Sequence, residues 1–172
     1  RLCNRSARLP PQSDTRRDGA SMGWTQFGEK HIMVVKGAGV RGSVDVPTAF
    51  VLKFSGERLA DSGDFLAGGF ERADGSDVFL IGPEVADQVF HHYAYVRDGK
   101  EHKLFLDGVV VARDSFIGGP GDTSDLPLAI GVGTTLAPIN MFVGVIDEVK
   151  IFNRTPSDEE IRDVYGDGSS SG

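Results

Sequence analysis

The stretch that most constrains the fold is residues 90–107, FHHYAYVRDGKEHKLFLD, because it has the pattern of a β-hairpin. Two alternating runs flank Asp98-Gly99, a pair that favours a turn with positive φ whose twist matches the strands that it joins. On the first strand, alternation places His92, Ala94 and Val96 on one face. We expect that face to pack against the core.

The opposite face of this hairpin is unusually aromatic for a surface that should meet water. We expect it to carry one contiguous open patch, made of His91, Tyr93, Tyr95 and Phe105. These four side chains are the predicted ligand-binding residues, because exposed apolar patches often mark binding sites. The alternative is that this face is also core, covered by the loop at 37–47 or by a C-terminal helix.

The rest of the chain consists of short β-rich runs separated by Gly, Asp and Ser, and the 172 residues include 23 glycines. This pattern predicts an all-β fold, an antiparallel jelly-roll β-sandwich. Besides the hairpin, strands are expected over residues 24–27, 31–36, 49–54, 65–72, 78–81, 109–116, 128–132 and 142–152.

One short C-terminal helix is also expected. Ser157 and Glu160 form a capping box, Ile161 and Val164 would pack on the sandwich, and Gly166 would end the helix. The expected organisation is a mobile basic arm over residues 1–20, the sandwich over 21–166 and a flexible tail over 167–172.

Several motifs resemble laminin-G-like domains of the concanavalin A-like lectin and glucanase superfamily. They are the hairpin, LAIGVG at 128–133, FVGVIDEVKIFNR at 142–154 and PSDEEIRDVYG at 156–166. Phe90 stands where those domains commonly have Trp. The resemblance covers roughly residues 21–166 and implies a concanavalin A-like sandwich.

Asp147 alternates with Val145, Val149 and Ile151, which predicts a carboxylate on a buried face that needs a partner. Backbone amides or an arginine would satisfy it. The resemblance implies a structural calcium ion instead, with Asp147 as a ligand. Asp122 and Asp125 form a second oxygen-rich cluster that could also hold calcium.

Histidines invite a zinc or catalytic interpretation. His91 and His92 are adjacent on a strand, so they point to opposite faces and cannot ligate one metal ion in the usual way. His92 is expected to be buried, whereas His31 and His102 are expected at the surface. The alternating Glu-x-Asp-x-Glu run that the resemblance would require for a retaining glucanase does not occur in the sequence.

The formal net charge of −7 argues against nucleic-acid binding and suits a neutral glycan, a cation or a basic protein surface. No run is apolar enough for membrane insertion. By analogy with the family, we expect a non-catalytic carbohydrate-binding module, extracellular or at the cell surface and part of a larger protein. A protein-adhesion domain with an extracellular protein partner, and a glycan-cleaving enzyme, are the alternatives.

Overall fold

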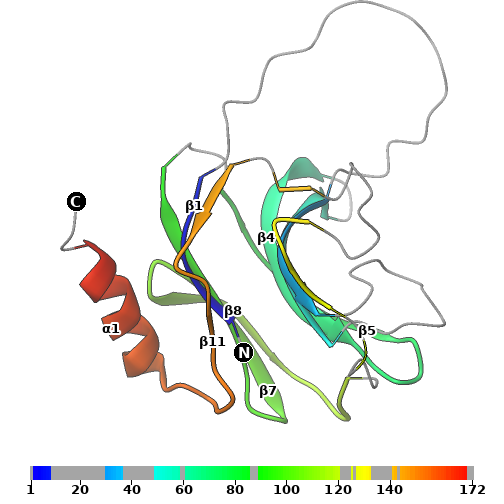
Figure 1. Ribbon diagram of the computed structural model, residues 1–172. Coiled ribbons are helices and arrows are strands. Elements are labelled where there is room, and N and C mark those ends of the chain that lie inside the picture. The colour runs from blue at the N-terminus through cyan, green and yellow to red at the C-terminus, as the bar shows by residue number, and fades with distance from the viewer. Residues whose placement is uncertain are drawn as a thin grey trace, which may run out of the picture.

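The computed structural model describes residues 2–8, 30–36, 49–58, 61–85, 89–120, 125, 127–132, 141–142 and 144–169. Two antiparallel sheets face one another, and one helix lies against the outer side of the first sheet (Figure 1). The predicted antiparallel β-sandwich with a C-terminal helix is therefore confirmed.

The first sheet, which the helix covers, has the order β10-β1-β6-β7-β8, and β11 also pairs with β1. Its strands are β1 (Leu2–Arg8), β6 (His91–Arg97), β7 (Glu101–Leu106), β8 (Val109–Ser115), β10 (Val145–Asp147) and β11 (Lys150–Ile151). The predicted hairpin forms its centre as β6 and β7.

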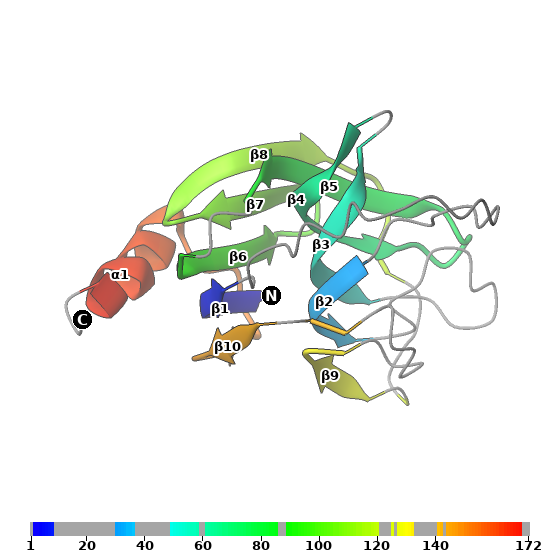
Figure 2. The same cartoon turned by 90° about the horizontal axis from the view of Figure 1, so that it is seen from above.

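The second sheet has the order β5-β4-β3-β2-β9. Its strands are β2 (Lys30–Lys36), β3 (Phe50–Arg58), β4 (Asp61–Glu71), β5 (Asp77–Glu84) and β9 (Leu128–Ile130). Seen from above, β5 and β8 lie near one another at the same edge of the sandwich (Figure 2), and the two strands are in contact.

The main core lies between the sheets. Its fully or almost fully buried side chains are Met33, Val34, Leu52, Leu66, Leu80, Val85, Tyr93, Tyr95 and Leu104. Gly68 of β4 gives the Tyr95 ring its space, since a Cβ there would lie 2.9 Å from Tyr95 Cδ2. The absence of a side chain at Gly68 is therefore part of how the two sheets pack around Tyr95.

The helix α1 (Asp158–Ser169) begins at the predicted capping box. The Glu160 amide donates to Ser157 Oγ at 3.1 Å, and the Ser157 amide donates to Glu160 Oε2 at 2.8 Å. Ile161 is fully buried against Ala94, Val96 and Phe105, as expected for packing on the sandwich.

The sequence predicted that the helix would end at Gly166, but the helix continues to Ser169. Gly166 is not among the glycines with positive φ, so it does not act as a left-handed C-cap. The first residues of the expected flexible tail are therefore helical.

The N-terminal segment also differs from the expected basic arm. Leu2–Arg8 forms β1, which pairs with β6 on one side and with β10 and β11 on the other. A polar composition does not reveal this, because the stabilisation comes from backbone pairing with strands distant in sequence. Residues 9–29, with the strand expected at 24–27, and the loop at 37–47 lie outside the described residues.

Candidate functional site

The predicted open aromatic patch is wrong for three of its four residues. Tyr93, Tyr95 and Phe105 are 1%, 2% and 1% exposed. Tyr93 and Tyr95 belong to the core between the sheets, whereas Phe105 packs under α1. The alternative was right that these side chains are buried, but its expected cover, the helix, holds only for Phe105, because the second sheet covers the two tyrosines.

The register of the hairpin explains this division. Directly opposite residues in an antiparallel pair share a face. Tyr95 is opposite Leu104 and Ala94 is opposite Phe105, so Phe105 joins the Ala94 face and not the tyrosine face. Gly99 has the expected positive φ, 105°.

His91 keeps some exposure, at 15% of its side chain. Its Nδ1 lies 2.7 Å from Asp107 Oδ2, and Asp107 Oδ1 accepts the His92 amide at 2.9 Å. Asp107 and Gly108 both have positive φ, 50° and 74°, in a two-residue turn between β7 and β8. Asp107 therefore joins this turn to the start of β6.

Of the predictions for the histidines, one is confirmed and one is wrong. His92 is buried, as predicted, at 2% exposure. His102 is 1% exposed, so its predicted surface position is wrong. In this register His102 lies two residues before Leu104 and therefore on the same face, the tyrosine face, which points into the core. The side chain of His31 lies outside the described residues.

Asp147 is exposed, so its predicted burial is wrong. Its Oδ1 accepts the amide of Glu148 at 2.8 Å. Glu148 has a φ of 47°, which interrupts the alternation, and Ile146 and Val149 pack on the core instead. The strand thus presents to solvent the side chains that a continuous strand would have buried.

Calcium binding stays a prediction. Asp125 is exposed, and Asp122 lies outside the described residues. Within the described part of the chain, no three His, Cys, Asp or Glu side chains are grouped closely enough to hold a metal ion.

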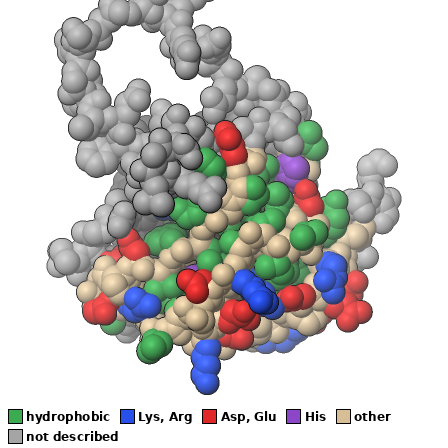
Figure 3. Space-filling model, turned by 180° about the vertical axis from the view of Figure 1, so that it is seen from behind, with side chains coloured by type: hydrophobic (Ala, Val, Ile, Leu, Met, Phe, Trp, Pro, Cys, Tyr) green, Lys and Arg blue, Asp and Glu red, His purple; other side chains and the backbone are tan. Residues whose placement is uncertain are grey.

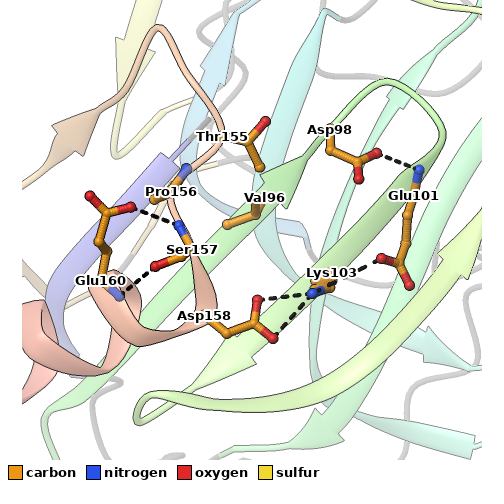
Figure 4. A pocket seen from close by; sticks show the side chains of 9 residues that line it. All are labelled: Val96, Asp98, Glu101, Lys103, Thr155, Pro156, Ser157, Asp158 and Glu160. Atoms are coloured by element: carbon orange, nitrogen blue, oxygen red, sulfur yellow. Dashed lines mark hydrogen bonds and ion pairs between the residues drawn. The ribbon is translucent and has the colours of Figure 1, made fainter.

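A pocket of about 400 Å³ opens between the β6–β7 hairpin and the beginning of α1 (Figure 4). We call it the hairpin–helix pocket. It is lined by Val96, Asp98, Glu101, Lys103, Thr155, Pro156, Ser157, Asp158 and Glu160. Its two walls come from parts of the chain more than fifty residues apart, which the sequence did not predict, although the turn and the capping box were each visible.

Hydrogen bonds hold both walls of this pocket. Asp98 Oδ1 accepts the Lys100 and Glu101 amides at 2.9 and 2.7 Å, which fixes the turn. Lys103 Nζ reaches both carboxylate oxygens of Asp158, at 2.9 and 3.1 Å, which joins the hairpin to the helix. These bonds fix the positions of Asp98, Lys103 and Asp158 in the lining.

The pocket is acidic, with four carboxylates and one ammonium group. The Arg154 guanidinium beside Glu160, with the Ser157 amide, lowers the pKa of Glu160 to about 2. This carboxylate is therefore ionised throughout the physiological range. The arrangement can accept hydrogen bonds from hydroxyl or amino groups and would repel an anion.

Several side chains on the outer face of the second sheet are buried, among them Val35 and Val51 at 0% and 1% exposure. The Phe79 ring lies against Gly69, where a Cβ would be 2.7 Å from Phe79 Cδ1. Lys53 Nζ lies 4.7 Å from the centroid of this ring. Ile81, further along β5, is 40% exposed.

The edge formed by β5 and β8 carries both apolar and charged exposed side chains, with Val109 near one end of β8 and Arg113 and Asp114 near the other. Figure 3 shows the molecule from behind, where hydrophobic side chains gather in the middle and charged side chains lie mostly below them. Val109 of β8 is 63% exposed, and Val89 and Phe90 before β6 are 57% and 49% exposed. No helix in the described part of the chain is long and apolar enough to cross a membrane.

The fold defines the class, a lectin-like β-sandwich with a terminal helix. The chain belongs to the concanavalin A-like lectin/glucanases superfamily, whose family model matches residues 33–162. The resemblance seen in the sequence is thus confirmed. Comparison with curated protein sequences gives no match.

Solved structures show the same fold. The CBM40 of the Ruminococcus gnavus IT-sialidase superposes with a TM-score of 0.66 at 18% identity, covering 96% of this chain and 82% of that one. Its form bound to alpha2,3 sialyllactose gives 0.65, with the same identity and coverage. The SAP-like pentraxin from Limulus polyphemus gives 0.61 at 12% identity, covering 95% of this chain and 68% of that chain. The fold is thus one that carbohydrate-binding modules use.

Proposed function

We propose that this domain is a non-catalytic carbohydrate-binding module that holds a neutral sugar in the hairpin–helix pocket. The observation that carries the proposal is the pocket itself, a polar cavity of about 400 Å³ on a fold shared with carbohydrate-binding modules. Small-molecule pockets are generally about 300–1,000 Å³. The cavity therefore suits one sugar unit or two.

The lining offers the groups that a sugar needs. Asp98 and Glu101 can accept hydrogen bonds from hydroxyl groups, and Thr155 can donate or accept. Val96 and Pro156 supply an apolar surface for the C–H groups of a ring (Figure 4). Such convergence of polar groups around an apolar patch supports ligand binding.

Charge supports a neutral ligand over an acidic one. Lys103 Nζ lies 2.9 Å from Asp158 Oδ1 and 4.0 Å from Glu101 Oε2, and Glu160 pairs with Arg154. Even with Arg154 counted beside Lys103, the four carboxylates of the pocket outnumber the cations. A carboxylated sugar would meet like charges there. The sialylated ligand of the R. gnavus module belongs to that protein, and we expect this chain to discriminate against such ligands.

The test is a glycan array carrying matched neutral and sialylated glycans, followed by calorimetry with the neutral glycan that binds best. Glu101→Gln should weaken binding about 10- to 100-fold, the effect of losing a charge-assisted hydrogen bond. Glu159→Gln is the matched control, because Glu159 is exposed on α1 but does not line the pocket. Both variants should keep the wild-type Tm.

The affinities of these variants distinguish the hairpin–helix pocket from the outer face of the second sheet as the binding site. Unchanged affinity in Glu101→Gln and Thr155→Ala, together with loss of binding in Phe79→Ala, would move the site to the outer face of the second sheet. If the protein binds no glycan on the array, the proposed carbohydrate binding is wrong.

As part of the same proposal, we expect the module to act outside the cell or at its surface. Fractionation of cells that express the tagged full-length protein tests this.

Protein adhesion is the second candidate, because β8 and β5 expose the apolar side chains of Val109 and Ile81, at 63% and 40%. Val109→Lys should abolish capture of an extracellular protein partner in a pull-down while leaving glycan binding unchanged. Loss of both activities, or of neither, would argue against this edge as an interface.

A further inference from the structure

His102 of β7 is a buried titratable residue that the proposed binding site does not use. It is 1% exposed, and its ring centroid lies 5.3 Å from that of Phe116, 5.9 Å from Tyr95 and 6.4 Å from Phe70. Its Nδ1 lies 3.1 Å from the Tyr95 hydroxyl. The neutral ring can accept the hydrogen bond from Tyr95, whose own pKa burial raises, so the phenol stays protonated.

Charged groups reach this ring from three strands. Arg97 lies on β6, Asp114 is directly opposite His102 on β8, and Glu101 is its neighbour on β7. The rings of Phe70 and Phe116 cannot titrate. Burial has the largest effect and lowers the pKa of His102, Asp114 and Glu101 raise it, and Arg97 lowers it, with a lowered value as the result.

We propose that His102 makes this end of the sandwich sensitive to acid, and with it the hairpin–helix pocket. Glu101 and Lys103, which flank His102 in β7, line that pocket on the opposite face of the strand. A protonated ring would place a positive charge among three aromatic rings and turn Nδ1 into a donor facing the Tyr95 hydroxyl. The consequence for ligand binding rests on the proposed function, but the consequence for stability does not.

The direction of the effect follows from the two protonation equilibria. A histidine in the unfolded chain has a pKa of about 6.5. Above that pH the ring is neutral in both states and contributes no pH dependence. Below it the unfolded state binds a proton that the folded state resists, so stability falls as the pH falls until the lowered folded-state pKa is reached. Carboxylates titrate near pH 4, below this window.

The experiment is denaturant unfolding between pH 7.0 and 5.5 with the wild type and His102→Gln. Glutamine stays neutral, and its carbonyl oxygen can accept a hydrogen bond from the Tyr95 hydroxyl. Between pH 6.5 and 5.5 the unfolding constant of the wild type should rise more than that of the variant, by up to about fivefold. His92 is also buried and is present in both proteins, so the comparison removes its contribution. Equal pH dependence of the two proteins would overturn the proposal.

Two further measurements use the wild-type protein and therefore do not require His102→Gln to fold. In the wild type, the ring resonances of His102 should show a neutral imidazole at pH 6, and a ring that titrates at about 6.5 would overturn the idea. Amide hydrogen exchange, corrected for intrinsic rates, should show protection of β7 falling between pH 7.0 and 5.5 before that of β3 and β4. If the protection of β7 relative to β3 and β4 does not change with pH, the proposed link between His102 and the pocket is wrong. This measurement needs no ligand.

Discussion

Gly68→Ala is the sharpest test of how the two sheets pack. Gly68 of β4 faces β6 across the core, and its missing side chain leaves room for the Tyr95 ring. A Cβ added there would lie 2.9 Å from Tyr95 Cδ2 and 3.0 Å from Leu104 Cδ1. Both neighbours are buried, at 2% and 0% exposure, so neither can move aside into solvent.

The expected cost comes from two opposing effects. Overpacking a well-packed core generally costs about 1–3 kcal/mol. Replacing glycine by alanine in a strand returns roughly 0.5–1 kcal/mol through the smaller entropy loss on folding. We therefore expect Gly68→Ala to lower the free energy of unfolding by about 1–2 kcal/mol, which for a chain of this size lowers Tm by roughly 2–8 °C.

Thermal and urea unfolding measure this change against two other glycines. Gly82→Ala would place a Cβ 3.2 Å from Leu104 Cδ2, a looser contact that predicts a smaller loss. Gly119→Ala meets no atom within 4 Å and should be neutral or slightly stabilising. A Gly68→Ala protein as stable as the wild type, with the Gly119→Ala control behaving as expected, would refute the packing of Tyr95 against β4.

The remaining predictions concern the helix and the carboxylates. Gly166→Ala should stabilise the protein by about 0.5–1 kcal/mol in urea unfolding, because Gly166 is helical and no atom lies within 4 Å of an added Cβ. Phe105→Ala should cost about 3–5 kcal/mol, since this side chain is 1% exposed beneath α1; a cost below 1 kcal/mol would contradict that placement. Asp147→Ala should change stability by no more than about 0.5 kcal/mol, because Asp147 is exposed. If the predicted calcium site exists, EDTA should lower Tm by mass action, and an unchanged Tm would count against it.

The capping box and the fold class could be predicted because their signals are local. Ser157 and Glu160 bind one another's amides as their spacing implies, and Ile161 is buried as the helical period requires. Alternation and turn residues likewise predicted the strands from His91 to Ser115. Such features need only neighbouring residues to be correct.

The prediction for Asp147 failed because it assumed an uninterrupted strand. A one-residue change of phase puts the side chains before it and after it in opposite registers, so Asp147 does not share a face with Val149, which packs on the core. Glu148 supplies that change with a φ of 47°, a conformation that is uncommon for a glutamate and that no local residue pattern predicted. The role of Leu2–Arg8 was missed for a related reason, because its pairing partners are distant in sequence.

The placement of Phe105, by contrast, could have been predicted from the hairpin alone. Any turn that joins the two strands with an even number of residues pairs odd positions of β6 with even positions of β7, so Tyr93 and Tyr95 face Leu104 and Leu106. Both faces of the hairpin then carry large apolar side chains, and both need a cover. The second sheet covers the tyrosines and α1 covers Phe105. In the described part of the chain both faces of the hairpin are thus covered along its centre, and the hairpin–helix pocket opens beside it, where the helix begins.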